Sequence, residues 1–320
     1  MASTIFPINT RSATSIRPIN LARDMARVMY LLNRVFSPTL DAEGRRALNS
    51  MSNQPAFILQ LHRLSKRIAP GFIYELNGEI VGNISIIPTL RKNRVIIANV
   101  AVHEDFRRRG IARMMLEATL EYLDNLDINT VMLQVDVENK GARQLYLDFG
   151  FKAVGSTTLW IAAPHSWHDL NVPQSAEIRP LRSSENQAAF ELDRATFPRD
   201  LCWPEPIEHN VYHSNWWKWI DNFLNGKSAE SWVAADEDGL HGVATIWSEW
   251  GQPHRLTVRV DPDQHEDVLP PLVAKLLRRL KYLRRRHVSI EHPLDDALMS
   301  ELLLAANFYA KRNLTTMRRG

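Results

Sequence analysis

Alternating apolar and polar positions divide the first half of the chain into strands and helices. After a short strand at 16–19, apolar residues recur at helical spacing over 21–36, and a second helical pattern lies within 42–68. Residues 72–76 and 80–87 read as two strands joined by an Asn-Gly pair, the strongest short signal for a hairpin turn. This pattern predicts a mixed α/β domain.

Two strand–loop–helix segments follow. An apolar run at 95–98 leads through a basic loop into residues 111–122, whose apolar positions have helical spacing. A second apolar run at 131–137 leads into another helical segment that ends at Gly150, a residue typical of helix ends. A last pair of strands is predicted after Phe151. The predicted order is β-α-α-β-β-β-α-β-α-β.

The basic loop has the composition of a phosphate-binding site. Arg107, Arg108 and Arg109 precede Gly110, directly before the predicted helix. The amide groups and the dipole at a helix N-terminus favour an anion, and a glycine lets the backbone approach it closely. Arginine supplies forked donors that suit phosphate. Neither the dinucleotide fingerprint nor the P-loop pattern occurs, so we interpret this loop as a pyrophosphate site of another kind.

The pattern Arg107-x-x-Gly110-x-Ala112 resembles the Gln/Arg-x-x-Gly-x-Gly/Ala motif of the GNAT superfamily of acyl-CoA N-acyltransferases. Its second signature, which follows a strand, is matched downstream at every fixed position, namely Asn139, Ala142, Leu145, Tyr146, Gly150 and Phe151. The resemblance covers roughly residues 14–161. It implies a central sheet whose fourth and fifth strands splay apart and hold the pantetheine arm of acetyl-CoA, the expected co-substrate.

The resemblance also implies roles for single residues. Backbone N–H groups of the strand should polarise the thioester carbonyl and pair with pantetheine, and Tyr146 should hydrogen-bond to or protonate the departing thiolate. The cofactor-binding residues implied in this way are Asn99, Val100, Ala101, Val102, Arg107, Arg108, Arg109, Gly110, Ile111, Ala112, Arg113, Asn139, Ala142 and Tyr146.

The general base is left open. Peptide N-terminal acetyltransferases similar to this sequence place a glutamate where Gln134 stands, and glutamine cannot accept a proton. Glu75, at the end of a predicted strand, is a candidate catalytic residue. Asp136 and Glu138 are alternatives, as is a water chain held by Asn99.

The second half of the chain repeats the pattern of the first. Ile178-Arg-Pro-Leu matches Ile16-Arg-Pro-Ile, and Val258-Arg-Val matches Val100-Ala-Val. We therefore predict two tandem GNAT folds, each a mixed, splayed sheet flanked by helices. The predicted division is a flexible tail at 1–13, a catalytic domain at 14–161, a linker at 162–176 and a degenerate domain at 177–320.

The second copy departs from the motif where chemistry would need it. Residues 265–270, His-Glu-Asp-Val-Leu-Pro, stand opposite the basic loop, so carboxylates replace arginines and Val268 replaces the glycine. Leu303 stands where Tyr146 would be. We expect an acidic loop that repels pyrophosphate, and a copy that serves as scaffold, substrate wall or dimer surface.

Composition narrows the range of partners that this protein is expected to bind. The 320 residues are 45% hydrophobic and 23% charged, as in globular proteins, and a net charge of +3 is too small to indicate nucleic acid. The single cysteine, Cys202, and the lack of an HExxH pattern give no metal site. Without a long apolar run or a leader, we expect no membrane partner and a cytoplasmic location.

Two functions remain. The first is an N-acetyltransferase that moves an acetyl group from acetyl-CoA to a primary amine of a small molecule or peptide, by direct attack in a ternary complex. The alternative is a non-catalytic acyl-CoA-binding or interaction protein on the same scaffold. The intact loop and Tyr146 favour the enzyme. The acceptor, the acyl chain length and the oligomeric state, a homo-oligomer included, stay open.

Overall fold

The computed structural model describes residues 14–36, 69–89, 91–173, 175–202, 212, 227–237 and 239–320. Contacts divide the chain into two compact units. Unit 1 comprises Met1–Gln134, Gly141–Lys152 and Met317–Gly320, and unit 2 comprises Val135–Lys140 and Ala153–Thr316. The second helical segment predicted within 42–68 lies outside the described residues.

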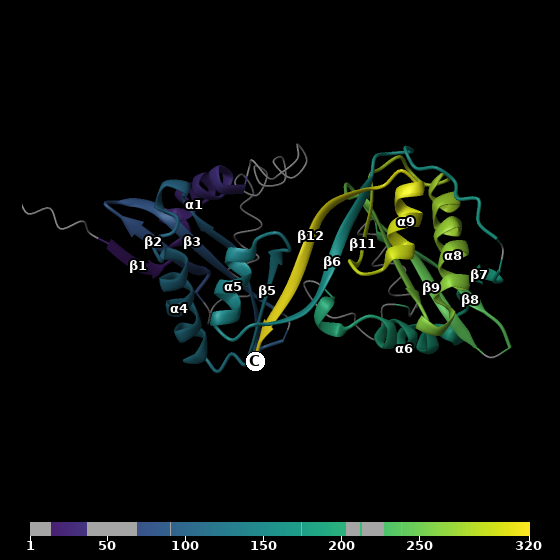
Figure 1. Cartoon of the computed structure of the whole chain (residues 1–320), viewed down its shortest axis with the longest axis horizontal. Helices are drawn as coiled ribbons and strands as arrows, with labels where there is room; N and C mark the ends of the chain where they lie inside the picture. Colours follow the sequence, from purple (N-terminus) through teal and green to yellow (C-terminus); the bar gives the residue numbers. More distant parts are fainter. Residues whose placement is uncertain are drawn as a thin grey trace, which may run out of the picture. The chain divides into compact units, whose positions relative to one another are not determined.

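The elements of the first half follow the predicted order (Figure 1). They are β1 (Thr14–Pro18), α1 (Leu21–Phe36), β2 (Gly71–Leu76), β3 (Glu79–Pro88), β4 (Arg94–Val102), a 3₁₀ helix (Glu104–Phe106), α4 (Ile111–Asp124), β5 (Thr130–Asp136) and α5 (Lys140–Asp148). In the turn between β2 and β3, Asn77 and Gly78 have φ angles of 51° and 84°, as a two-residue hairpin of this type requires.

The sheet of unit 1 has the strand order β1-β2-β3-β4-β5, and the end of β12 (Tyr309–Arg319) lies beside β5. Neighbouring residues of β2 point to opposite faces, because side chains alternate along a strand. Ile73 joins the buried cluster under α1, which includes Val28 and Leu32. Phe72 contacts Tyr122 of α4 edge to face, with ring centroids 5.3 Å apart. The helices α1 and α4 therefore cover opposite faces of the sheet.

Strands β4 and β5 are paired over only part of their length. They are parallel from Arg94 opposite Thr130 to Ile97 opposite Leu133. Beyond this point β4 carries a bulge, where Asn99 has a φ of 51°. A bulge bends its strand and ends regular pairing, so the two strands diverge at the end that leads to the basic loop.

After its first strand, the second half repeats the order of the first half. It contains β6 (Lys152–Ala162), β7 (Ile178–Pro180), α6 (Asn186–Thr196), β8 (Lys227–Ala235), β9 (Leu240–Glu249), β10 (His254–Val260), α8 (His265–Leu280), β11 (Val288–Pro293), α9 (Ala297–Ala305) and β12, with 3₁₀ helices at Ser183–Glu185, Arg199–Leu201 and Pro262–Gln264. Strands β10 and β11 are also parallel over a short stretch only, from His254 opposite Val288 to Leu256 opposite Ile290.

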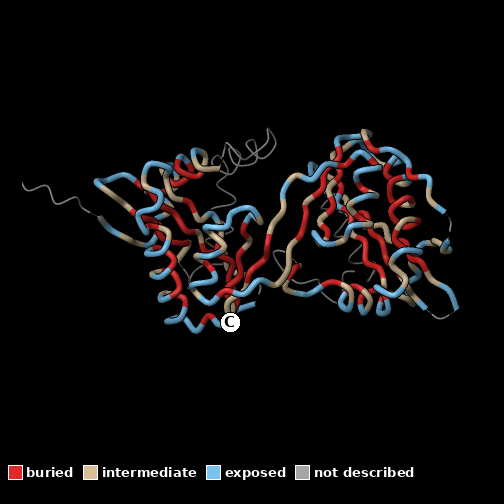
Figure 2. The backbone as a smooth tube through the Cα atoms, viewed as in Figure 1, coloured by how far each residue is buried: buried red, intermediate tan, exposed pale blue. Residues whose placement is uncertain are grey.

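Unit 2 has the strand order β12-β6-β11-β10-β9-β8-β7. Val233 of β8 packs under α6, whereas its neighbour Trp232 joins the large cluster under α8. Alternation along β8 thus places these two helices on opposite faces of the sheet. In each unit, Figure 2 shows that the strands are largely buried and that the outer faces of the helices are exposed.

Two details after Phe151 differ from the sequence prediction. A single strand, β6, follows instead of a pair, and it lies between β12 and β11, with Trp160 opposite Ile290. The segment predicted as a linker, 162–176, buries Trp167 and Leu170 in the core under α8. Contacts therefore divide the chain differently from the sequence repeat, and the domain bounds 14–161 and 177–320 stay an interpretation of that repeat.

The predicted acidic loop at 265–270 is wrong. These residues form the first turns of α8, which begins immediately after the 3₁₀ helix that ends at Gln264. In the first copy, residues 107–110 separate the corresponding 3₁₀ helix from α4. Acidic side chains at a helix N-terminus are stabilising, which explains Glu266 and Asp267 in this turn. None of the described helices is long and apolar enough to cross a membrane.

Candidate active site

The N-terminus of α4 is open for an anion. Gly110 occupies the N-cap position with φ 76° and ψ 0°, and no side chain caps the helix. The first main-chain hydrogen bond of the helix runs from Met114 N to Gly110 O, at 3.0 Å. The N–H groups that come before Met114 in the first turn of α4 have no partner within the helix. They and the positive end of the helix dipole can therefore bind a phosphate.

The three arginines of the loop do not share one role. The Nε of Arg107 donates to Val102 O at 3.2 Å, and Arg109 donates to Asp105 O at 2.9 Å while its guanidinium lies 5.1 Å from the centre of the Phe106 ring. These two side chains brace the loop. Arg108, with a φ of 60°, makes no interaction with any residue that the structure describes. Arg108 thus has all of its donors available to a ligand, whereas Arg107 and Arg109 keep only the donors that these contacts do not use.

The bulge of β4 is held by a buried amide that the sequence prediction missed. Asn83 is fully buried in β3, and its Nδ2 donates to Asn99 O at 2.8 Å and to Ser85 Oγ at 3.2 Å. The side chain of Asn99 reaches the same hydroxyl at 3.3 Å. A positive φ is unfavourable for a non-glycine residue, and these bonds stabilise it. The only signal was an amide within an otherwise apolar strand.

Tyr146 lies in α5 and is 5% exposed. Its ring contacts Phe151 edge to face, with centroids 5.8 Å apart. Burial raises the pKa of Tyr146 to about 12. Its hydroxyl makes no hydrogen bond within the described part of the chain. Tyr146 is therefore a protonated group with a free donor, which suits it to give a proton to a leaving group.

An ion pair connects the helix of the phosphate site to the helix of Tyr146. Arg113, in the first turn of α4, pairs with Asp148 at the end of α5. The guanidinium of Arg113 also lies 5.4 Å from the ring centre of Phe149. Arg113 was predicted as a cofactor ligand, but these contacts give it a structural role as well. The phosphate loop and Tyr146 thus belong to one packed part of unit 1.

The remaining predicted residues fall in different surroundings. Ala101 and Ile111 are buried, while Val100, Val102 and Ala112 are half-buried. Ala142 is half-buried in α5 of unit 1. Asn139 is exposed and belongs to unit 2. Within the described ranges, no cluster of three or more His, Cys, Asp or Glu residues could hold a metal ion.

Glu75 is held as an anion. Its Oε2 accepts from Arg17 at 2.8 Å, and its Oε1 lies 3.4 Å from Arg27. The hydrogen bond from Arg17 is the main cause that lowers the pKa of Glu75. A general base works best with a pKa near the operating pH, so this pairing disfavours Glu75 in that role. Asp136, another candidate, accepts a hydrogen bond from the Glu138 N–H at 2.8 Å.

Replacement of Glu75 by Gln should leave the turnover number unchanged within about twofold, while it lowers the free energy of unfolding by about 1 kcal/mol through loss of the ion pairs. Because the folded-state pKa of Glu75 is lowered, its stabilisation is present above the ordinary glutamate pKa and is lost on acidification. The stability difference between the two proteins should therefore shrink at acid pH. Urea unfolding at several pH values and initial rates would measure both.

Glu79→Gln is the matched control for Glu75→Gln. Glu79 is an exposed glutamate at the start of β3 and makes no contact of this kind with the described residues. Its replacement should change neither stability nor rate. If Glu75→Gln lowered turnover by about 10²-fold or more at unchanged stability, Glu75 would be the general base after all.

Comparison with known proteins agrees with this geometry. Residues 36–151 match the family model described as the acetyltransferase (GNAT) family. An N-alpha-acetyltransferase from Sulfurisphaera tokodaii is 32% identical over 114 residues, which cover 32% of this chain and 67% of that protein. The region that the family model matches includes the phosphate loop and the signature around Tyr146.

Two solved structures share the fold over nearly the whole chain. A GCN5-related N-acetyltransferase from Sphaerobacter thermophilus superposes with a TM-score of 0.60 at 13% identity and covers 96% of this chain and 95% of that one. A tandem GNAT protein from the clavulanic acid biosynthesis pathway has a TM-score of 0.51 at 16% identity, with 96% and 98% covered. At these identities the likeness concerns the fold alone. The chain belongs to the GNAT family of acetyltransferases, and it is an acyltransferase.

Proposed function

We propose that this protein transfers an acetyl group from acetyl-CoA to a primary amine of a small-molecule or peptide acceptor, by direct attack in a ternary complex. Enzymes of the family use acetyl-CoA as co-substrate in general. The observation that most supports the proposal is the open N-terminus of α4 in the same unit as the buried, protonated Tyr146.

The phosphate loop supplies binding energy at a distance from the reacting atoms. The pyrophosphate of acetyl-CoA binds the N–H groups at the start of α4 and the guanidinium of Arg108. Energy from this remote contact positions the thioester for attack. The main chain of residues 100–102 follows the bulge at Asn99, where β4 leaves its partner β5, and it pairs with the pantetheine arm and polarises the carbonyl.

The chemical step then uses Tyr146 as an acid. The amine nitrogen attacks the thioester carbon, a C–N bond forms and the C–S bond breaks. The thiolate takes the proton of the Tyr146 hydroxyl, and the amine loses its extra proton to Asp136, Glu138 or the water chain held by Asn99. Burial keeps Tyr146 protonated until this moment.

The second copy has no equivalent of the phosphate loop, since α8 starts directly after its 3₁₀ helix. In this proposal unit 2 binds no acetyl-CoA. We also propose a cytoplasmic location, with the acceptor and the oligomeric state to be determined.

Calorimetric titration of acetyl-CoA into the full chain should give one site per chain. A panel of small primary amines and short peptides should then include an acceptor that releases free CoA thiol and gains an acetyl group by mass spectrometry. Binding without turnover on any acceptor would favour the non-catalytic acyl-CoA-binding protein. Two sites per chain would contradict the degenerate second copy, and no binding would contradict the proposal as a whole.

A further inference from the structure

The bulge of β4 removes two residues from the regular pairing of the sheet. The register of β3 and β4 shifts between Asn83 and Ser85, so that one residue of β3 faces two residues of β4, Asn99 and Val100. Neither of the two has a partner residue in β3, and the pairing of β4 with β5 ends before them. The peptide unit between Asn99 and Val100 therefore needs partners other than a neighbouring strand.

Asn83 supplies the partner of the carbonyl in this peptide unit. Its Nδ2 donates to Asn99 O at 2.8 Å. The carbonyl of Asn99 and the N–H of Val100 belong to one planar trans peptide unit, so the two groups point in opposite directions. The hydrogen bond thus fixes the direction of the Val100 N–H, which points away from Asn83. A hydrogen bond to the carbonyl also polarises the peptide unit and strengthens its N–H as a donor.

An amide is an unfavourable side chain for the position of Asn83. The residue is fully buried, and its Oδ1 has no hydrogen-bond partner in the described part of the chain. Its partners in register, Ile73 of β2 and Ala101 of β4, belong to the buried apolar cluster under α1. A buried acceptor without a partner is destabilising, and an apolar side chain would avoid that cost. Stability therefore does not explain the amide, whereas its bond to the bulge does.

The second copy shows that the fold does not require an amide at this position. Gly82 of β3 and Gly242 of β9 occupy equivalent places, because an added Cβ would collide with α4 at the first and with α8 at the second. The next residue is Asn83 in β3 but Val243 in β9. Val243 is buried in the apolar cluster under α6. An apolar residue thus fills the equivalent position of unit 2.

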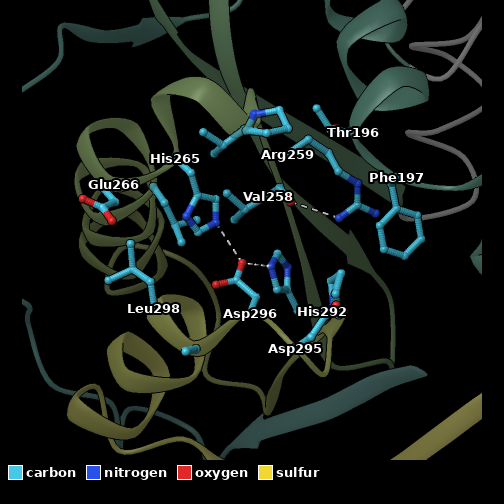
Figure 3. Close-up of a pocket in the computed structure, with 15 residues that line it drawn as sticks. Thr196, Phe197, Val258, Arg259, His265, Glu266, His292, Asp295, Asp296 and Leu298 are labelled. Carbon is cyan, nitrogen blue, oxygen red and sulfur yellow. Dashed lines mark hydrogen bonds and ion pairs between the residues drawn. The ribbon is translucent and has the colours of Figure 1, made fainter. Parts of the chain in front are cut away.

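The bulge is missing from the second copy as well. Strands β9 and β10 pair without a register shift. Val258 of β10 stands where β4 has both Asn99 and Val100, and its carbonyl accepts from Nη1 of Arg259 at 3.0 Å, on the wall of a pocket in unit 2 (Figure 3). The buried amide and the bulge therefore occur together in the copy that has the phosphate loop, and the other copy has neither.

We propose that Asn83 is a positioning residue for acetyl transfer. This inference rests on the function proposed above, in which the main chain of residues 100–102 polarises the thioester carbonyl. By holding the carbonyl of Asn99, Asn83 aims the Val100 N–H at the oxygen of the bound thioester and strengthens this donor as negative charge develops there. Asn83 acts through the peptide unit and not by contact with the substrate.

The probe for this role is acetyl-CoA labelled with ¹³C at the acetyl carbonyl. When it binds the full wild-type chain, the infrared band of the labelled carbonyl should move to lower frequency, because a hydrogen bond to the oxygen weakens the C=O bond. Asn83→Leu keeps a similar volume and removes both donors, so most of this shift should be lost. The turnover number should fall about tenfold, less than the roughly 10²–10³-fold loss that follows removal of an oxyanion donor. The KM for acetyl-CoA should stay within about twofold.

Ser85→Ala is the matched control for Asn83→Leu. The Oγ of Ser85 accepts the other hydrogen bond from Nδ2 of Asn83, at 3.2 Å, so this variant keeps the bond to Asn99 O. The band shift and the turnover number should both stay close to those of the wild type. Asn83→Ser, whose side chain is one atom too short for the bond to Asn99, should behave like Asn83→Leu, and it provides the test if the leucine prevents folding.

The outcomes separate this inference from the proposed function. No binding of acetyl-CoA, or no band shift in the wild type, would overturn both. A wild-type shift that Asn83→Leu and Asn83→Ser leave unchanged, with unchanged turnover, would overturn the role of Asn83 alone, even if these variants were less stable. Equal losses in Ser85→Ala would also contradict it, because the effect would then not depend on the bond to the Asn99 carbonyl.

Discussion

Gly110→Glu is expected to weaken acetyl-CoA binding by about 10²-fold or more. Two like charges about 4 Å apart repel by about 4 kcal/mol at an effective dielectric of about 20, and the new carboxylate would lie beside the pyrophosphate. A Cβ at Gly110 meets no atom within 4 Å, so the side chain has room. The φ of 76° adds strain of about 1–2 kcal/mol, which the fold should tolerate. Calorimetry with acetyl-CoA measures the loss.

Gly78→Glu is the matched control for Gly110→Glu. Gly78 has a φ of 84°, and a Cβ there also meets no atom within 4 Å, but it lies in the turn between β2 and β3. The variant therefore adds the same charge and a similar strain away from the phosphate loop, and binding should stay unchanged. Gly110→Ala separates strain from charge and should have a smaller effect than Gly110→Glu. Equal losses at Gly78 and Gly110 would contradict the assigned phosphate site.

Tyr146→Phe is expected to lower the turnover number by about 10²–10⁴-fold, the usual range for loss of a general acid. The affinity for acetyl-CoA should change by less than about twofold, since the ring and its contact with Phe151 are kept. The hydroxyl has no hydrogen-bond partner among the described residues, so its removal should not destabilise the fold. Single-turnover rates, calorimetry and thermal unfolding would separate these effects.

Tyr74→Phe is the matched control for Tyr146→Phe. It removes another buried tyrosine hydroxyl of unit 1, in β2, and should leave turnover unchanged.

The pKa of Tyr146 also predicts how the rate depends on pH. The acid form of Tyr146 is present below a pKa of about 12, so the wild-type rate should not fall from its ionisation within the ordinary alkaline range. Unchanged turnover in Tyr146→Phe would remove this residue from the mechanism.

The order of strands and helices could be predicted from sequence because it depends on neighbouring residues. Apolar spacing indicated α1 and α4, and the Asn77-Gly78 pair indicated the hairpin whose positive φ angles the structure shows. The phosphate loop is local in the same sense. The sequence alone placed Gly110 directly before the predicted helix, and the structure adds that no side chain caps α4 there.

Pairings between distant residues were decided by tertiary structure. Glu75 is disfavoured as the general base because Arg17, 58 residues away in the sequence, pairs with it where β1 and β2 lie side by side. Strand β6 pairs with β11 and β12, which lie far along the chain, instead of with a strand that follows it directly. Asn83 acquires its role only where the bulge at Asn99 brings a carbonyl to its amide. Periodicity shows which face of an element is buried but not which strand lies beside it.

The family motifs, the element order and the chemistry offered by Gly110, Arg108 and Tyr146 could be predicted from the sequence. The tertiary structure then showed that Arg108 and the Tyr146 hydroxyl have no partner among the described residues. It buried Tyr146 and thereby raised its pKa, and it used Arg107 and Arg109 to brace the loop. It also brought β10, β11, the start of α8 and the residues before α9 together around a pocket in unit 2. Burial and pairing arise from long-range packing, which sets the charge state and the free donors of each side chain.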